Sequence, residues 1–190
     1  CEIHLATPKK RNMRAVLQRV SSASVTVNGA IVSSINQGIC VLLGIANDDT
    51  QEDMDYMVKK ILNVRVFADE AGEKWWQRSV KDAGLEVLCV SQFTLYGSTT
   101  KGYKPDFHNS MKSESSKEMY AAFLEQMKRE YVEDRIKDGI FGAMMQVNIV
   151  NEGPVTLELD SRKFEYVDKM EGKKTKSDNK KKKQDEEKRT

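Results

Sequence analysis

A short apolar run in the middle of this sequence ends abruptly in polar residues. Residues 87–90 are Val-Leu-Cys-Val, residues 91–94 are Ser-Gln-Phe-Thr, and the pattern stops at Gly97. Such a run is typical of a buried strand, so we predict a strand over residues 85–95 that carries small hydroxyls and backbone amides to one end of a sheet. By itself the pattern also fits a strand end whose hydroxyls are simply hydrogen-bonded, which is the commoner case.

A second segment, residues 151–156, has a similar character and reads Asn-Glu-Gly-Pro-Val-Thr. It follows residues 145–149 and leads into residues 155–159, in which apolar and polar side chains alternate as they do along half-buried strands. We therefore predict a strand, a tight turn at Gly153-Pro154 and a return strand.

Strand patterns also dominate the first part of the chain. Apolar and polar residues alternate over residues 14–20 and 25–27, and the small residues 21–24 between them predict a bend or bulge in the strand. The Asn28-Gly29 pair that follows is typical of a two-residue hairpin turn. Residues 30–35 are therefore expected to pair back. The unbroken apolar run over residues 39–45 predicts a central strand.

Two stretches carry apolar residues at helical spacing, residues 54–62 and residues 119–131. Each defines one buried stripe, so we predict one helix in each stretch. Trp75 and Trp76 lie between the two stretches and are expected to cover the sheet. Two strand-rich parts, each with a helix, predict a single α/β domain.

The charges are unevenly spread, although the net charge is only +2. Residues 161–190 hold 12 Lys and Arg against 7 Asp and Glu, whereas residues 13–160 hold 16 against 21. Residues 162–190 contain too few apolar side chains for burial to offset the entropy lost on ordering. We therefore predict that they form a disordered, lysine-rich tail. This tail either attracts RNA or DNA non-specifically or keeps the protein soluble. The acidic remainder argues against a broad surface for phosphates.

The N-terminal residues, the apolar runs, the cysteines and the histidines bear on compartment and cofactors. Residues 1–12 lack the apolar stretch of a signal peptide, and we interpret them as an N-terminal extension or a cloning remnant. No run approaches the roughly 18 apolar residues that suggest a membrane span. Cys40 and Cys89 lie in apolar runs, His4 and His108 are the only histidines, and no spacing suggests a zinc site. We therefore expect no metal, no cofactor, no membrane contact and a cytoplasmic location.

The two polar segments together, Ser-Gln-Phe-Thr-Leu and Asn-x-Gly-Pro-Val-Thr, resemble the paired motifs of D-aminoacyl-tRNA deacylases. Three shorter stretches resemble the same family in the same order: residues 18–20, 102–108 and 141–145. The resemblance covers residues 13–161, which we interpret as a deacylase domain. It implies two layers of β-strands with helices packed on one face, and a homodimer.

The resemblance also implies a reaction, which is hydrolysis of the ester between a D-amino acid and the 3′-terminal adenosine of tRNA. The residues it places at the catalytic floor are Ser91, Gln92, Phe93 and Thr94, and those it places in the adenosine pocket are Phe141, Gly142 and Met145. Neither hydroxyl at the floor has a histidine at a predictable distance. A site of this kind can instead stabilise the developing oxyanion with backbone N–H groups, and the resemblance implies that those around Phe93 and Thr94 do so. The 2′-hydroxyl of the adenosine would help to activate water.

Chiral selection is the harder problem, because D- and L-aminoacyl esters carry the same functional groups. A rigid obstacle must stand where the L side chain would project. The resemblance assigns this role to a cis Gly153-Pro154 contributed by the partner subunit, and Asn151 and Thr156 complete the motif. We expect Arg19 to hold the turn by hydrogen bonds to its backbone, and a Cβ on Gly153 to clash with the substrate. Glycyl-tRNA has no side chain to reject and would also be cleaved.

Two other classes of function stay open. One is a nucleic-acid-binding dimer that uses the basic tail, for example at replication-origin DNA, a role associated with some animal relatives. The other is a structural dimer with a dead site. The complete segments 91–94 and 151–156 argue against a dead site, and the acidic residues 13–160 argue against DNA binding as the primary role.

Overall fold

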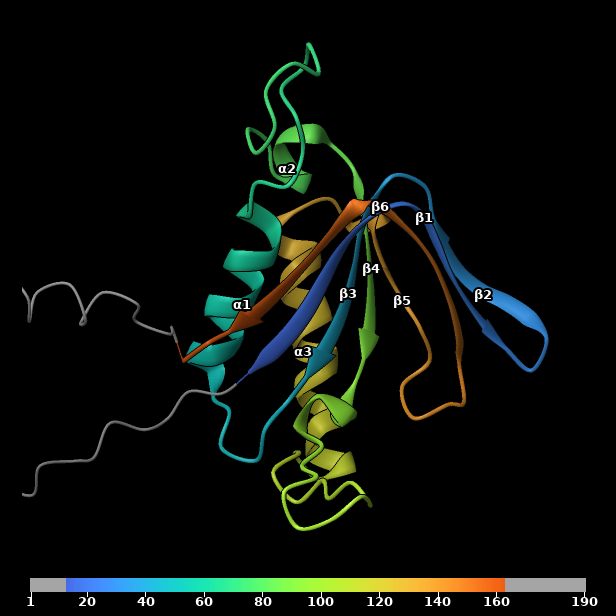
Figure 1. Cartoon of the computed structure of the whole chain (residues 1–190), viewed down its shortest axis with the longest axis vertical. Coiled ribbons are helices and arrows are strands. Elements are labelled where there is room, and N and C mark those ends of the chain that lie inside the picture. Colours follow the sequence, from blue (N-terminus) through green and yellow to red (C-terminus); the bar gives the residue numbers. More distant parts are fainter. Residues whose placement is uncertain (1–12, 163–190) are drawn as a thin grey trace, which may run out of the picture.

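The computed structural model describes residues 13–162, and a single six-stranded sheet runs through them (Figure 1). The strands are β1 Arg14–Val27, β2 Ala30–Ile35, β3 Gly38–Gly44, β4 Glu86–Ser91, β5 Ile136–Asp138 and β6 Gln146–Asp160. The helices are α1 Gln51–Asn63, α2 Val80–Ala83 and α3 Ser113–Glu130, with 3-10 turns η1 Phe93–Tyr96 and η2 Glu133–Arg135. Residues 1–12, and the predicted disordered tail beyond Arg162, lie outside the described residues.

The sheet is mixed, and β1 pairs with three other strands. One edge of β1 pairs antiparallel with β3 and then with β2, and its other edge pairs antiparallel with β6. From β3 the sheet continues through β4 to β5 in parallel pairing. Parallel neighbours need a crossover, and α1 with α2 supplies the first while α3 supplies the second. The predicted α/β class, the hairpin at Asn28-Gly29 and the central strand are confirmed.

The expectation of two separate layers of strands is corrected to one curled sheet. β1 pairs with β3 over residues 14–20 and with β2 over residues 23–27, so the same strand serves two neighbours along its length. The curl encloses a small apolar core of its own, apart from the core beneath the helices. Its buried members are Val20, Ala23, Val25, Ile35, Cys40, Leu88 and Val90. Alternation in the sequence shows which residues face a core, but not which strands share one ladder.

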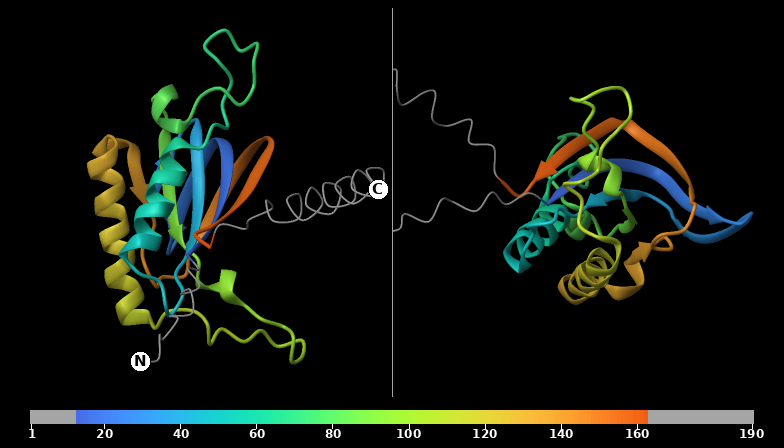
Figure 2. Two further views of the ribbon diagram at one scale, coloured as in Figure 1. Left: turned by 90° about the vertical axis from the view of Figure 1, so that its left-hand side faces the viewer. Right: turned by 90° about the horizontal axis from the view of Figure 1, so that it is seen from below.

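The helices cover one face of the sheet, as predicted (Figure 2). The stripe of α1 is buried, and so are the central apolar residues of α3. Both stripes pack against side chains from β1, β3 and β4 in the larger core. This packing fixes the carboxyl ends of β3 and β4 next to the start of α3, which is where the candidate site lies.

Candidate active site

Strand β4 ends sooner than the sequence suggested. It stops at Ser91, and residues 93–96 form the 3-10 turn η1 instead of extending the strand to residue 95. The N–H of Gln92 donates to the carbonyl of Leu43 at 2.7 Å, which closes the strand just before the turn. The first N–H groups of a helical turn have no acceptor within the turn. The turn thus gathers the N–H groups of Phe93 and Thr94 at the carboxyl end of the strand.

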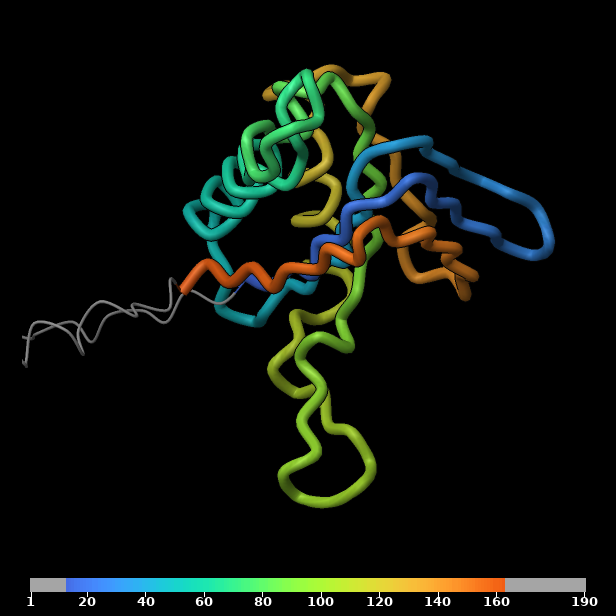
Figure 3. Tube along the Cα trace, turned by 45° about the horizontal axis from the view of Figure 1, so that its top comes forward, coloured from blue at the N-terminus to red at the C-terminus, as the bar shows by residue number. Residues whose placement is uncertain are grey.

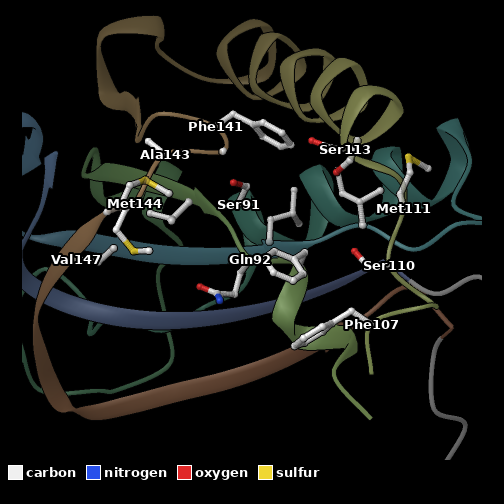
Figure 4. A pocket seen from close by; sticks show the side chains of 17 residues that line it. Ser91, Gln92, Phe107, Ser110, Met111, Ser113, Phe141, Ala143, Met144 and Val147 are labelled. Carbon is white, nitrogen blue, oxygen red and sulfur yellow. The ribbon is translucent and has the colours of Figure 1, made fainter. Parts of the chain in front are cut away.

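A cavity of about 680 Å³ opens at this end of the sheet (Figure 4). Ser91, Gln92 and Phe93 form one side of it, and the loop between β5 and β6 forms another. Figure 4 shows the Ser91 side chain between those of Gln92 and Phe141. The structure thus brings three of the four predicted floor residues together with all three residues of the predicted adenosine pocket: Phe141, Gly142 and Met145.

Thr94 lies beside the cavity and does not line it. The side-chain amide of Gln92 donates to the Thr94 hydroxyl in a short hydrogen bond, so Thr94 holds a lining residue in place. The ring of Phe93 is exposed and meets the ring of Phe107 edge to face, with 5.1 Å between the ring centres. His108 does not line the cavity, and its ring is hydrogen-bonded to Asp106. That hydrogen bond lowers the pKa of the Asp106 carboxyl.

The Gly153-Pro154 segment is built differently from the predicted strand, turn and return strand. β6 continues through it, pairing with β1 on both sides. Asn151 pairs with Val20 and Thr156 with Gln18, so residues 152–155 bulge out opposite Arg19 alone. The Asn151 amide donates to the Val155 carbonyl and to the Thr156 hydroxyl, both at 3.3 Å, and so ties the two ends of the bulge together. The Gly153-Pro154 bond is cis, as predicted.

Arg19 supports this bulge by other contacts than those expected. Its Nη1 donates to the Val66 carbonyl at 2.6 Å, and its Nε lies 3.2 Å from Glu152 Oε2, an ion pair without good hydrogen-bond geometry. It therefore holds the side chain of Glu152 rather than the backbone of the turn. A Cβ on Gly153, at φ +114°, would come within 2.9 Å of Val155 Cγ2 and 3.0 Å of Arg19 Nη2. The expected clash is thus with the protein's own chain before any substrate.

The residues that line the cavity and the bulge lie at different levels of the sheet. Arg19 pairs with Ile39 on β3, whereas Ser91 pairs with Leu43, four residues further along the same strand. At about 3.3 Å per residue, this separates the two levels by roughly 13 Å along the strand. One chain therefore does not bring Arg19, Gly153 and Pro154 to its own cavity.

The five stretches and this geometry agree with what comparison with known proteins finds. A sequence model described as D-Tyr-tRNA(Tyr) deacylase matches residues 16–160. The chain belongs to the D-Tyr-tRNA(Tyr) deacylase family. "D-aminoacyl-tRNA deacylase 1" of Homo sapiens is 57% identical over 149 residues, covering 78% of this chain and 70% of the relative. "D-aminoacyl-tRNA deacylase" of Dictyostelium discoideum is 51% identical over 150 residues, covering 79% and 99%.

Two solved structures share the fold of this family member. One, named "c-Myc DNA Unwinding Element Binding Protein", has a TM-score of 0.74 at 57% identity and covers 77% of this chain and 97% of its own. The other, described as "Structural Analysis of a probable eukaryotic D-amino acid tRNA deacylase", has a TM-score of 0.69 at 20% identity and covers 78% and 99%. The second supports the fold alone.

Some residues that line the cavity were missed by the sequence analysis. Ser110, Ser113 and Ser116, from the loop before α3 and its first turns, line the cavity with Met111. The only available signal was the long loop of residues 97–112 directly after the polar strand end (Figure 3). Among the residues that the structure describes, no three His, Cys, Asp or Glu side chains gather as around a metal ion. No helix in that part of the chain is long and apolar enough to cross a membrane.

Proposed function

We propose that this protein hydrolyses the ester bond between a D-amino acid and the 3′-terminal adenosine of tRNA. The observation that carries the proposal is the cavity in which residues 91–93 face residues 141–145, in a member of a family whose curated relatives are named D-aminoacyl-tRNA deacylases. The polar side chains that line it are Gln92 and four serines. These groups suit a neutral, hydroxyl-rich ligand such as a ribose.

The chemistry proposed for the cavity uses the backbone. The N–H groups of Phe93 and Thr94, at the start of η1, would donate to the ester carbonyl as it becomes an oxyanion, and one such donor is typically worth about 3–4 kcal/mol. Water is the second reactant, and the adenosine 2′-hydroxyl would help to activate it. The adenine would lie against Phe141, whose ring is half-buried and packs 5.7 Å from the ring of Tyr120. The reaction as proposed uses no cofactor.

Selection against L-aminoacyl esters is assigned to the bulge of a second copy of the chain. The bulge lies roughly 13 Å along the strand from Ser91 of the same chain. It would therefore reach the floor of a partner subunit rather than its own. Among the described residues β6 pairs with β1 alone, so its outer edge is open to another chain. Exposed apolar side chains on Phe93, Met144 and Val150 would be covered in a homodimer. Glycyl esters would pass, because glycine has no side chain to exclude.

The proposed location is a reducing cytoplasm, which would keep Cys40 and Cys89 as the free, buried thiols that they are. Burial raises the pKa of the Cys40 thiol to about 12 and raises that of Cys89 as well. Buried thiols of this kind are inert. The cytoplasmic location stays a prediction.

A nucleic-acid-binding role is a second candidate, favoured by the likeness at 57% identity to the solved structure that is named as a DNA-binding protein. Residues 163–190 would supply the attraction, with 11 Lys and Arg against 7 Asp and Glu. The two functions can coexist, because the proposed chemistry uses only residues between 13 and 162.

The deciding experiment compares matched D- and L-aminoacyl-tRNA, charged with the same amino acid, and follows release of that amino acid. We expect release from the D-ester and from glycyl-tRNA, little release from the L-ester, and no loss of rate after chelation of metals. Equal cleavage of both enantiomers, or of neither, would refute the proposal.

A further inference from the structure

Trp75 and Trp76 lie side by side on the loop between α1 and α2, and both are 54% exposed, contrary to the expectation that they cover the sheet. They differ in what they touch. The guanidinium carbon of Arg19 lies 4.8 Å from the ring centre of Trp75. Among the described residues no such contact involves Trp76.

The loop that carries Trp75 is well supported. Asp69 accepts hydrogen bonds from the N–H groups of Glu73 and Lys74 at 2.8 and 3.2 Å. The side-chain amide of Gln77 donates to the Trp75 carbonyl at 3.1 Å. These hydrogen bonds hold the backbone of the loop in place, so the Trp75 ring has a defined position for packing against Arg19.

Arg19 is the residue that packs against this surface, and it is only 3% exposed. Its guanidinium is held on three sides: by the Val66 carbonyl, by the Glu152 carboxylate and by the Trp75 ring. Arg19, Glu152 and Trp75 also line one cavity of about 180 Å³ beside the bulge. Val66 contacts Nη1 and Glu152 lies beside Nε, whereas the Trp75 ring lies over the guanidinium carbon itself.

We propose that Trp75 is a positioning residue for chiral selection, which acts through Arg19 on the Gly153-Pro154 bulge. The indole face holds the guanidinium in the plane that reaches Glu152 and lies beneath Gly153, where a Cβ would come within 3.0 Å of Arg19 Nη2. Without the ring, Arg19 turns toward solvent and the bulge gains room to yield to an L side chain. The inference rests on the proposed function, since it assumes that this bulge is the selecting element.

The test uses the full chain with Trp75→Ala, Trp75→Leu, Trp75→Phe and the matched control Trp76→Ala, which removes an equally exposed indole. We expect Trp75→Ala and Trp75→Leu to raise the ratio of L- to D-ester kcat/KM about tenfold, as loss of a cation–π contact of about 1.4 kcal/mol would. The D-ester kcat should stay within about threefold of that of the parent protein, since the cavity is untouched. Trp75→Phe keeps a ring face and should restore most of the selectivity, and Trp76→Ala should resemble the parent.

A second readout is hydrogen exchange of the backbone amides in residues 150–156. Exchange there should quicken in Trp75→Ala and Trp75→Leu but not in Trp76→Ala, while exchange in β3 and β4 stays unchanged. Unchanged selectivity in both Trp75→Ala and Trp75→Leu, or an equal change in Trp76→Ala, would overturn the positioning role. A parent protein that cleaves neither ester would instead overturn the proposed function, so the two failures are distinguishable.

Discussion

The two ends of the sheet are built on opposite principles. At the carboxyl end of β4 the candidate floor consists of short polar side chains, a 3-10 turn and an exposed phenylalanine around an open cavity. At the other end a buried arginine is held by a carbonyl, a carboxylate and an aromatic face beneath a bulge of four residues. Backbone donors keep their place when a side chain changes, whereas the bulge depends on particular side chains. Substitutions at the bulge should therefore have larger effects than substitutions at the floor.

The largest effect among the substitutions is expected from Gly153→Ala, at the bulge. The added Cβ would meet Val155 and Arg19, and it must adopt φ +114°. We expect the D-ester kcat/KM to fall roughly 100-fold, the cost of displacing a group by about 1 Å, and the free energy of unfolding to fall by about 2 kcal/mol. Steady-state kinetics and urea unfolding measure the two effects.

Gly29→Ala is the control for Gly153→Ala. Gly29 also has a positive φ, +81°, but a Cβ there would have nothing within 4 Å. It should lose about 1 kcal/mol of stability from backbone conformation alone and keep its activity. If both variants behaved alike, the close contacts beneath the bulge would have no role in function.

A smaller effect is expected from Arg19→Lys, which keeps the charge but loses the planar group that spans Val66, Glu152 and Trp75. The ratio of L- to D-ester kcat/KM should rise about tenfold, while the D-ester kcat changes by no more than about threefold. Arg78→Lys is the matched control, because Arg78 lines the same small cavity but bonds to the Ala68 carbonyl. Equal effects of the two substitutions would show that selection does not depend on the geometry of Arg19.

Smaller still should be the losses in Ser91→Ala and Thr94→Ala. If backbone N–H groups stabilise the oxyanion, each variant should lose no more than about tenfold in kcat, against roughly 10⁶-fold for a true catalytic serine. Thr94→Ala also removes the acceptor of the Gln92 amide, so it should cost more than Ser91→Ala. Single-turnover deacylation measures both, and a covalent aminoacyl-enzyme trapped by acid quench would contradict the backbone mechanism.

The two ends of the sheet also differ in how well they could be predicted from the sequence. The strand that leads to residues 91–94 was predicted because a buried strand that ends in small polar residues is a local pattern, whereas the resemblance to the deacylases made this strand end the candidate floor. The strand's last four residues were still misassigned, since a 3-10 turn that packs on Gly44 leaves no mark in apolar alternation. Family resemblance supplied residues 141–145, and the structure places them across the cavity.

The support of the bulge was less predictable, because it joins residues far apart in the chain. The contacts of Arg19 with Val66, Trp75 and Glu152 span from 47 to more than 130 positions of sequence. The family resemblance placed Arg19 against the Gly153-Pro154 turn, but the expected hydrogen bonds to the backbone of the turn are not the contacts that Arg19 makes. Likewise, a Gly-Pro pair between two alternating runs favoured a hairpin, whereas pairing with β1 on both sides makes it a bulge. Such pairing is set by the neighbouring strand and not by the local residues.

The smallest effect on catalysis should come from removing residues 163–190, because both ends of the sheet lie within residues 13–162. The truncated chain should keep its kcat and its preference for the D-ester at saturating tRNA. The removed residues carry 11 Lys and Arg against 7 Asp and Glu, so tRNA binding should become less sensitive to salt. The net charge of the removed residues is thus +4, the 11 positive less the 7 negative charges, and each phosphate that a protein neutralises adds at most about 0.9 to the slope of log affinity against log salt. Neutralisation of about four phosphates would therefore account for a flattening of no more than about 4. A fluorescence-anisotropy titration from about 50 to about 300 mM salt measures this slope.

A truncated chain that binds with the same slope would remove the basis for nucleic-acid attraction through this segment. A truncated chain that loses D-selectivity would show that the two ends of the sheet are not sufficient for selection.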